Sequence, residues 1–487
     1  MRNLVRRSLP DPYLLILLAV FVFSRIFLRI VLGVRFDMSS LTWAWQLLDP
    51  AWLKSDPLTS ICYMHMQPPL FNLLTAFALR TPFPSVLLDA LFLTFGFLIT
   101  VILYRLAIWF GLSRPLSAIA VAVVFVLNPS SFLYETWYFY TYPVLFLTAL
   151  FSLLLIRATR NPTFWRLTAA LSVLTVITLT RSSYHLITFI IVGLGLVWFL
   201  RGRWRTVILA VAITSLPTFL WYFRNYVMFG TFSPTSWTGM NLTRLVWNMP
   251  GWGEGRFREL HRQGIVSSLM TTYPFSPPDV YVRLLSFKER TGMEVLDSFY
   301  EPTTGGPNYN HAVYPVVSGV LLRDNINLAR RYPYVYIRAV ASAFKNFTYP
   351  PYAYVYMGRF YLLFDENNLR IFHSLKPFLR VYDLLYGWPG KKFPGITVLL
   401  LIMVFLLLLP RLLKRPETGV LSLFLLYLIG VHTAFERREN MRFRFQFEAV
   451  LVLLIMAGIT QSINSANSLP RNSMNSGESD ARDMGPS

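Results

Sequence analysis

The sequence predicts an all-α polytopic membrane protein with about ten transmembrane helices, interfacial helices and a large extracytoplasmic region. Of its 487 residues, 54% are hydrophobic and only 14% are charged, whereas a soluble domain carries about 25% charged residues. Apolar runs such as "GITVLLLIMVFLLLL" (395–409) approach the roughly 20 residues needed to cross a hydrocarbon core. The bilayer is therefore the expected solvent for most of the chain.

The expected spans are long apolar segments, some of them flanked by arginine or lysine. They cover residues 13–34, 84–110, 115–131, 140–157, 164–180, 184–200, 205–224, 394–413, 418–434 and 447–462. The first span follows a basic start like that of a signal peptide. Its apolar run is longer than a signal peptide needs and lacks a small-residue cleavage site, so it is predicted to be a retained helix.

Basic residues set the predicted orientation. The loops "LSRP", "RATRNPTFWR", "RGRWR" and "PRLLKRPE" alternate with loops that carry few positive charges. Lys and Arg concentrate in cytoplasmic loops, so both termini are predicted to be cytoplasmic. The protein would then be multi-pass in the plasma (inner) membrane of a bacterium or in the endoplasmic reticulum of a eukaryote.

This topology divides the chain into four expected parts. Residues 1–228 form an N-terminal transmembrane catalytic module with a first outer loop at 35–83, and 229–393 form an extracytoplasmic region with interfacial helices. Residues 394–462 form the C-terminal transmembrane helices, and 463–487 a disordered cytoplasmic tail. The net charge is +21, and the arginines mostly flank the spans. This arrangement indicates contact with a lipid surface and no nucleic-acid partner.

Polar residues near the first span are the first candidates for chemistry. Arg25 lies deep in that span, and an intramembrane charge usually faces a cavity or a partner. Asp37 follows the end of the span, where a fixed carboxylate can act as a general base. The structural alternative is that Asp37 caps the next short helix or pairs with Arg35.

The outer loop carries the segment "YMHMQPPLFN". Its prolines suit the first turn of a short interfacial helix, and His65, Gln67 and Asn72 are predicted to face a cavity. No HxH or HExxH spacing accompanies His65. The sequence therefore predicts no cofactor and gives a divalent metal little support.

Further polar residues fall on the outer side. They are Glu135, Arg181, Arg224, Asn310, His311, Glu439, Arg442 and Arg444. Arg442 and Arg444 break the positive-inside pattern. A phosphate at the membrane surface explains them, because a guanidinium binds its oxygens in a bidentate way. The alternative is an internal network with Glu439 and Glu448.

A carboxylate and several arginines on one side suit a substrate that has a phosphate and an apolar tail. The ordered motifs, Asp37 after the first helix, then "PPL" (68–70), "LTRSS" (179–183) and "RFRFQFEAVLVLL" (442–454), resemble the GT-C superfamily of integral-membrane glycosyltransferases. The resemblance is strongest to the dolichyl-phosphate-mannose–protein mannosyltransferase and aminoarabinose transferase branch.

The resemblance implies inverting transfer of a monosaccharide from a polyprenyl-phosphate donor on the extracytoplasmic face. Asp37 would be the catalytic base, and the arginines would hold the lipid phosphate. Family members often carry two acidic residues in the first outer loop, whereas Phe36 and Met38 flank Asp37 here. Glu135 is therefore the second catalytic candidate.

The sequence allows several acceptors and two alternative functions. The acceptor can be a protein, a glycolipid or a polysaccharide. A lipid-linked-substrate transporter or flippase is an alternative, although the sequence lacks the repeated halves and paired broken helices typical of transporters. A non-catalytic GT-C-like subunit is the second alternative function.

Overall fold

The structure is a computed structural model that describes residues 11–467 apart from 289, 357–362 and 389–394. Within these residues every regular element is a helix, and the extended pairings are two isolated bridges. The α-helices are α1 (Pro12–Ile26), α2 (Pro50–Ser55), α3 (Pro57–Cys62), α4 (Leu70–Leu79), α5 (Pro84–Trp109), α6 (Arg114–Val121), α7 (Pro129–Glu135), α8 (Thr141–Arg160), α9 (Phe164–Thr180), α10 (Ile187–Phe199), α11 (Trp204–Phe229), α12 (Thr238–Trp247), α13 (Glu254–Arg262), α14 (Pro278–Leu285), α15 (Glu294–Asp297), α16 (Val313–Arg331), α17 (Pro333–Phe347), α18 (Glu366–Ser374), α19 (Lys376–Leu385), α20 (Ile396–Leu412), α21 (Pro416–Ala434) and α22 (Asn440–Asn467).

Aspartate–proline pairs define where several helices begin. The carboxylates of Asp11, Asp49 and Asp56 accept hydrogen bonds from backbone amides in the first turns of α1, α2 and α3. The proline that follows each of them occupies the first helical position, where its missing N–H costs nothing. These short-range signals fix the starts of α2 and α3 in the outer loop.

Within the described ranges, six helical segments are long and apolar enough to cross a membrane. They are Pro12–Val31, Pro84–Trp109, Thr141–Arg160, Arg201–Phe229, Pro416–Ala434 and Asn440–Ile463. A seventh span is possible if α6 with its π-helical extension and α7, which meet at 54°, are counted as one broken span. Helices α4, α9, α10 and α20 are apolar but shorter. The chain is therefore an all-α, multi-pass membrane protein.

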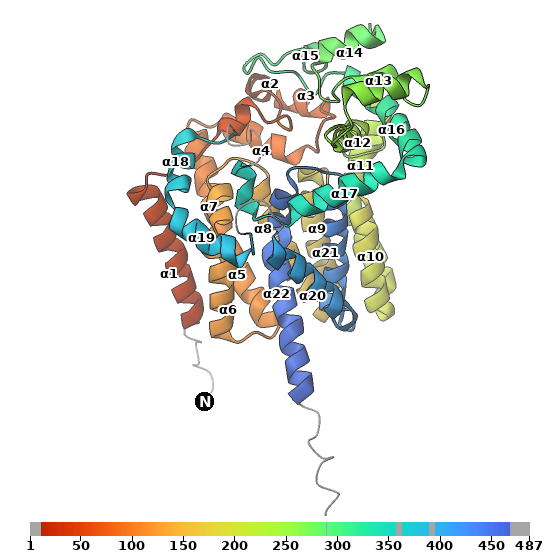
Figure 1. The fold of residues 1–487 in the computed structure, drawn as a ribbon. Helices are drawn as coiled ribbons and strands as arrows, with labels where there is room; N and C mark the ends of the chain where they lie inside the picture. Colours follow the sequence, from red (N-terminus) through yellow and green to blue (C-terminus); the bar gives the residue numbers. More distant parts are fainter. Residues whose placement is uncertain (1–10, 289, 357–362, 389–394, 468–487) are drawn as a thin grey trace, which may run out of the picture.

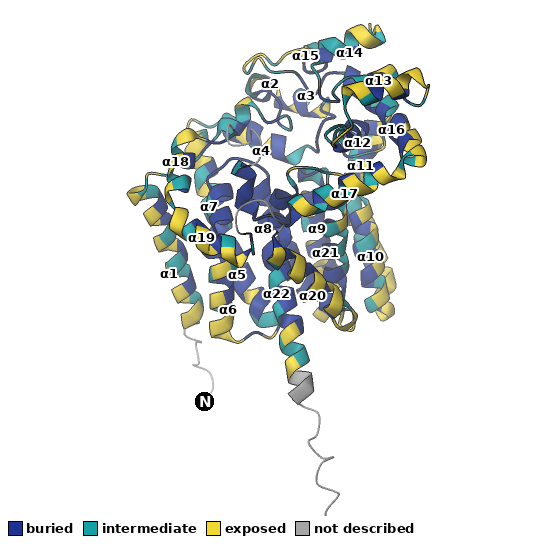
Figure 2. Ribbon diagram, in the orientation of Figure 1, coloured by how far each residue is buried: buried dark blue, intermediate teal, exposed yellow. Residues whose placement is uncertain are grey.

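The bundle has a buried centre and an exposed outer surface (Figure 2). In α8 and α22, 72% and 78% of the spanning window is buried, against 22% in α1 and 28% in α11. The outer helices expose large apolar side chains such as Leu194 at 66% and Val227 at 66%. A contiguous apolar surface of this kind requires lipid around it.

A cap of short helices covers one end of the bundle (Figure 1). Residues 35–83 and, apart from residue 289, residues 229–331 build it together, although they lie far apart in the sequence: Trp45 packs on Phe275 and Tyr309 with ring centroids 5.0 and 4.7 Å apart. Helices α12 and α16 approach so closely that a Cβ at Gly239 would lie 2.0 Å from the Ser318 carbonyl oxygen. Only glycine permits that crossing.

The two ends of the described chain lie at the same face of the bundle. Helix α1 begins, and α22 ends, at the face opposite the cap (Figure 1). Residues 463–467, predicted to start a disordered tail, form the last residues of α22. The rest of the predicted tail and the basic residues 1–10 lie outside the described residues.

Candidate functional site

The turn between α7 and α8 contacts several of the predicted site residues. Residues 135–142 ("ETWYFYTY") are all buried where the bundle meets the cap. Glu135 begins this segment and Tyr142 ends it, with Trp137 and Tyr140 between them. Different side chains of the segment contact α1, the outer loop, α9 and α22, so its local geometry sets the positions of the other groups.

At its first end the segment holds a buried ion pair. The Nη2 of Arg25 lies 2.9 Å from Oε2 of Glu135, and these side chains are 4% and 1% exposed. The Tyr142 hydroxyl donates to the same oxygen at 2.8 Å, and Arg25 Nη1 donates to the Val126 carbonyl at 2.6 Å. A Cβ at Gly96 would lie 2.8 Å from Oε2 of Glu135. Each charge is thus compensated inside the membrane.

At its other end the segment meets two further arginines. The guanidinium of Arg181, at the end of α9, donates to the Tyr140 hydroxyl. Arg442, in the first turn of α22, donates to the same hydroxyl at 3.2 Å and to Thr141 Oγ1 at 3.0 Å. Arg442 also pairs with Glu439. Both arginines are almost fully buried, at 3% and 1% exposure.

A second carboxylate and a third arginine extend this cluster. Glu436 pairs with Arg244 of α12 at 3.1 Å. Burial raises the pKa of Glu436, whereas for Glu439 the nearby Arg442 and Arg244 outweigh burial and lower its pKa. The cluster, defined as Arg181, Arg244, Arg442, Glu436 and Glu439, therefore has more positive than negative charge. Among the described residues, Nε of Arg181 and Nε of Arg442 also have no hydrogen-bond partner.

A cavity of about 480 Å³ adjoins this arginine–glutamate cluster. Its polar lining includes Arg181, Ser183, His185, Thr235 and Glu436. Its apolar lining includes side chains that are about half exposed on the outside of the bundle, namely Ile187 (49%), Ile190 (56%), Phe232 (50%) and Phe435 (49%). A charged inner end is thus joined to an apolar wall that faces the lipid.

Asp37 is bound to the same segment through its backbone and does not line the cavity. Its backbone pairs with the segment: Asp37 N donates to Thr136 O at 2.7 Å, and Tyr138 N donates to Asp37 O at 2.8 Å. Its carboxylate accepts from the amides of Ser39 and Asp365, both at 2.7 Å. Burial raises the pKa of Asp37, partly offset by these hydrogen bonds. No ion pair with Arg35 forms within the described residues.

Arg444 occupies a different environment from Arg442. Its guanidinium donates to the carbonyl oxygens of Phe347 and Tyr349 at the end of α17 and lies 3.4 Å from Glu448. Positive charge at a helix C-terminus satisfies the last carbonyls. Arg444 thus caps α17 and does not line the cavity. Its contacts favour the alternative given above, an internal network with Glu448.

The two histidines among the predicted site residues, His65 and His311, pack in the cap. His65 Nδ1 lies 2.7 Å from the Ser236 hydroxyl, and its backbone N–H donates to Asn310 Oδ1 at 2.8 Å. Burial lowers the pKa of His65 to about 3 and that of His311 to about 4, so both rings are neutral at pH 7. His311 Nδ1 accepts from Val313 N. These contacts give both rings a structural role.

The loop around His65 backs one wall of the cavity. Arg224 donates to the Met64 carbonyl at 2.7 Å, and Thr235, which lines the cavity, donates to the Met66 carbonyl at 2.6 Å. Gln67 is buried beside these residues at 7% exposure. None of the predicted polar residues of "YMHMQPPLFN", His65, Gln67 and Asn72, lines the cavity.

Four residues at this site were not singled out by the sequence: Tyr140, Ser183, Arg244 and Glu436. Glu436 stands three residues before Glu439, in the loop between α21 and α22, and this closeness in sequence is a usable signal. Tyr140 is one of 26 tyrosines and Arg244 one of many arginines, and nothing in their local patterns marks them. In the described part of the chain, no group of three or more His, Cys, Asp or Glu side chains is arranged to hold a metal.

Comparison with known proteins gives no match: no protein-family model, no curated protein and no solved structure matches this chain.

Proposed function

We propose that the protein is a membrane glycosyltransferase that moves a monosaccharide from a polyprenyl-phosphate donor to an acceptor outside the cytoplasm. One observation carries the proposal: a buried cluster with surplus guanidinium charge adjoins a cavity whose apolar wall faces the lipid. A ligand that completes this arrangement has an anionic head and an apolar tail. A polyprenyl phosphate has both.

The surplus charge suits a phosphate in particular. Buried charges are stable only when they are paired and hydrogen-bonded. The partnerless Nε atoms of Arg181 and Arg442 are donors of the kind that bind phosphate oxygens. The half-exposed Ile187, Ile190 and Phe435 on the cavity wall give a lipid tail a path from the bilayer.

Asp37 is the proposed general base. In this reaction the acceptor hydroxyl passes its proton to Asp37 and its oxygen attacks the anomeric carbon. The bond from that carbon to the phosphate oxygen breaks, and polyprenyl phosphate leaves with the bonding electrons, which the arginines stabilise. A carboxylate whose pKa is raised by burial is a stronger base than an ordinary aspartate.

Asp37 and the arginine–glutamate cluster flank one short stretch of chain. Asp37 pairs with the backbone around Trp137, and Arg442 contacts Tyr140. Three residues span at most about 10 Å. Aromatic rings of Trp43, Trp137 and Phe139 stack along this stretch, and the Arg442 guanidinium lies 4.7 Å from the Phe139 ring.

The proposal includes a GT-C-like fold with ten spans and cytoplasmic termini. Helices α9 and α20 have 17 residues each, which is the lower limit for crossing a bilayer. Helix α10 is shorter, at 13 residues, but its sequence, "ITFIIVGLGLVWF", contains no charged residue. The broken α6–α7 pair supplies the remaining span. An even number of crossings agrees with α1 beginning and α22 ending at one face (Figure 1).

Binding of polyprenyl phosphate to the purified full-length protein tests the site. We expect Arg181→Gln to weaken binding roughly 10–100-fold, the usual effect of losing a charge-assisted hydrogen bond. Arg262→Gln, on the exposed end of α13, is the matched control and leaves affinity unchanged. Equal affinity of wild type and Arg181→Gln refutes the phosphate site. Transport of the lipid across liposomes without a new glycosidic bond refutes the transferase and supports the flippase.

A further inference from the structure

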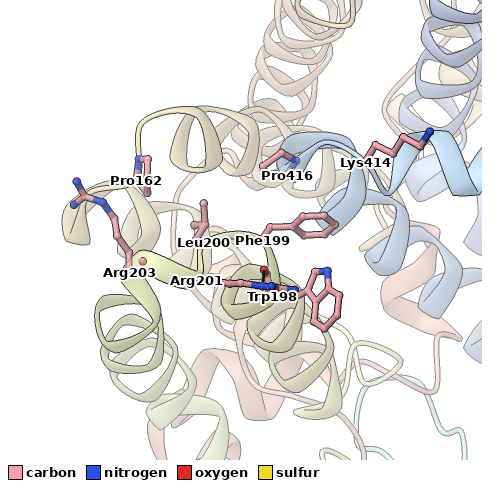
Figure 3. Close-up of a pocket in the computed structure, with 9 residues that line it drawn as sticks. Pro162, Trp198, Phe199, Leu200, Arg201, Arg203, Lys414 and Pro416 are labelled. Carbon is pink, nitrogen blue, oxygen red and sulfur yellow. Dashed lines mark hydrogen bonds between the residues drawn. The ribbon is translucent and has the colours of Figure 1, made fainter.

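The face of the bundle opposite the cap has two pockets lined by basic side chains. The first, of about 480 Å³, lies between the end of α10, the start of α11 and the α20–α21 turn. Figure 3 shows its basic residues diverging: Arg203 and Lys414 point away from one another at opposite edges. Arg201 lies against Trp198, its guanidinium carbon 4.6 Å from the ring centre. These side chains do not converge on a common point.

In the second pocket, three arginines border one space. This pocket, of about 640 Å³, is lined by Trp109 at the end of α5, Arg157 and Arg160 on α8, Asn161, and Arg166 on α9. The guanidinium carbons of Arg157 and Arg160 lie 5.3 and 5.2 Å from the centre of the Trp109 ring. Arg157 and Arg160 are three apart, on one face of α8.

The charge in this second pocket is poorly compensated. Arg160 Nε lies 3.7 Å from Glu417, a long contact. Arg157 and Arg166 form no ion pair with a described residue. Three guanidiniums thus face one carboxylate, and guanidinium groups so placed favour a phosphate.

Tryptophans place the pocket at the depth of lipid headgroups. Trp165, Trp198 and Trp204 flank the helix ends at this face and are 76%, 65% and 47% exposed. Exposed tryptophans at span ends mark the interface between bilayer and water. The phosphates most abundant at that depth are those of phospholipids.

We propose that the pocket formed by Trp109, Arg157, Arg160 and Arg166 binds the phosphate of an anionic phospholipid headgroup. Basic pockets between transmembrane helices are suited to such headgroups. The site is separate from the proposed donor site, because the two lie at opposite faces of the bundle. Neither proposal depends on the other.

Native mass spectrometry of the full-length protein, released from nanodiscs, tests this site. The nanodiscs contain either phosphatidylcholine alone or phosphatidylcholine mixed with phosphatidylglycerol. We expect retained phosphatidylglycerol on the wild type, with affinity reduced roughly 30-fold in the double variant Arg157→Gln, Arg166→Gln. Arg160 is left unchanged because it also donates to the Trp109 carbonyl at 3.1 Å.

Arg203→Gln is the matched control, since it removes an arginine from the neighbouring pocket at the same face. It should retain phosphatidylglycerol as the wild type does. An equal loss in the control would show general surface attraction and overturn the proposal. Displacement of the lipid by millimolar inorganic phosphate would reveal a site for a soluble anion and also overturn it. The double variant Arg157→Lys, Arg166→Lys, which keeps the charge, should retain part of the affinity even if the glutamine variant folds poorly.

Discussion

Arg25 Nη2 lies 2.9 Å from Glu135 Oε2, and this contact joins the first span to the turn between α7 and α8. The two residues are 110 positions apart in the sequence. Both are buried where water cannot screen or solvate them, and the Tyr142 hydroxyl fills a further position on the carboxylate. The ion pair therefore favours a structural role for Glu135, which is to hold in place the segment that carries Tyr140.

Glu135→Gln should destabilise the fold. The substitution leaves the buried Arg25 charge unpaired, and breaking one partner of a buried pair costs about 3–5 kcal/mol. The midpoint of thermal unfolding in detergent measures the loss. The double variant Arg25→Met, Glu135→Leu should recover much of it, and Arg29→Gln, in a more exposed pair with Asp89, should cost less. A stable Glu135→Gln protein without transferase activity would instead give Glu135 a catalytic role.

Asp37→Asn should abolish sugar transfer while leaving polyprenyl phosphate binding intact. The amide oxygen and nitrogen keep the shape of the side chain but cannot take a proton from the acceptor. Release of polyprenyl phosphate from a panel of polyprenyl-phosphate monosaccharides measures transfer. Asp56→Asn, an exposed helix cap in the same loop, is the control. A wild-type rate of transfer in the Asp37→Asn variant would show that Asp37 is not the general base.

Arg444→Gln should weaken the fold and leave donor affinity unchanged in the protein that folds. Its guanidinium binds carbonyl oxygens at the end of α17 and contacts Glu448. Hydrogen bonds from a charged group contribute about 1.5–3 kcal/mol, so the unfolding midpoint should fall. Unfolding curves check the loss of stability, and polyprenyl phosphate affinity, measured on the same preparation, checks that donor binding is unchanged. A stable variant with lost affinity would place Arg444 at the phosphate.

Glu301 should make the stability of the cap depend on pH. Burial, and to a smaller extent the nearby Asp49, raises its pKa from 4.5 to about 7, although the Thr304 hydroxyl donates to it. The protonated form is thus favoured by folding. Its contribution is complete below about pH 4.5, the unfolded value, and is lost as the pH rises through 7.

Glu301→Gln, which stays neutral at every pH, should therefore raise the unfolding midpoint at pH 8 and change it little at pH 4. Hydrogen–deuterium exchange of the 300–307 loop gives a local measurement. Glu294→Gln, at an exposed position, should show no such pH dependence. An unfolding midpoint equal to that of the wild type at pH 8 would contradict the prediction.

The sequence predicted the helical membrane architecture because apolar length is a local property. The aspartate–proline pairs at Asp49 and Asp56 likewise act within one turn, so the short helices that they begin have visible signals. The span count is less direct, since α9, α10 and α20 are too short for length alone to decide. Their apolar runs, such as "GITVLLLIMVFLLLL" at α20, supplied the prediction, and the arginines supplied the orientation.

The site was harder to predict because it depends on contacts between distant segments. Arg442 and Arg444 were grouped together, yet two residues apart on an α-helix point about 200° apart, and they face different environments. Helical geometry alone could have separated them. The pairing of Arg244 with Glu436 joins the cap to the last helices, and no local pattern encodes it.

Arg442 comes from the last described helix, whereas Tyr140 and Arg181 precede it by hundreds of residues. During synthesis the earlier helices enter the bilayer first, so until α22 is inserted the Tyr140 hydroxyl lacks one of its two arginine partners. A chain without α22 would therefore leave this arginine–glutamate cluster incomplete. Formation of the cluster is coupled to insertion of α22.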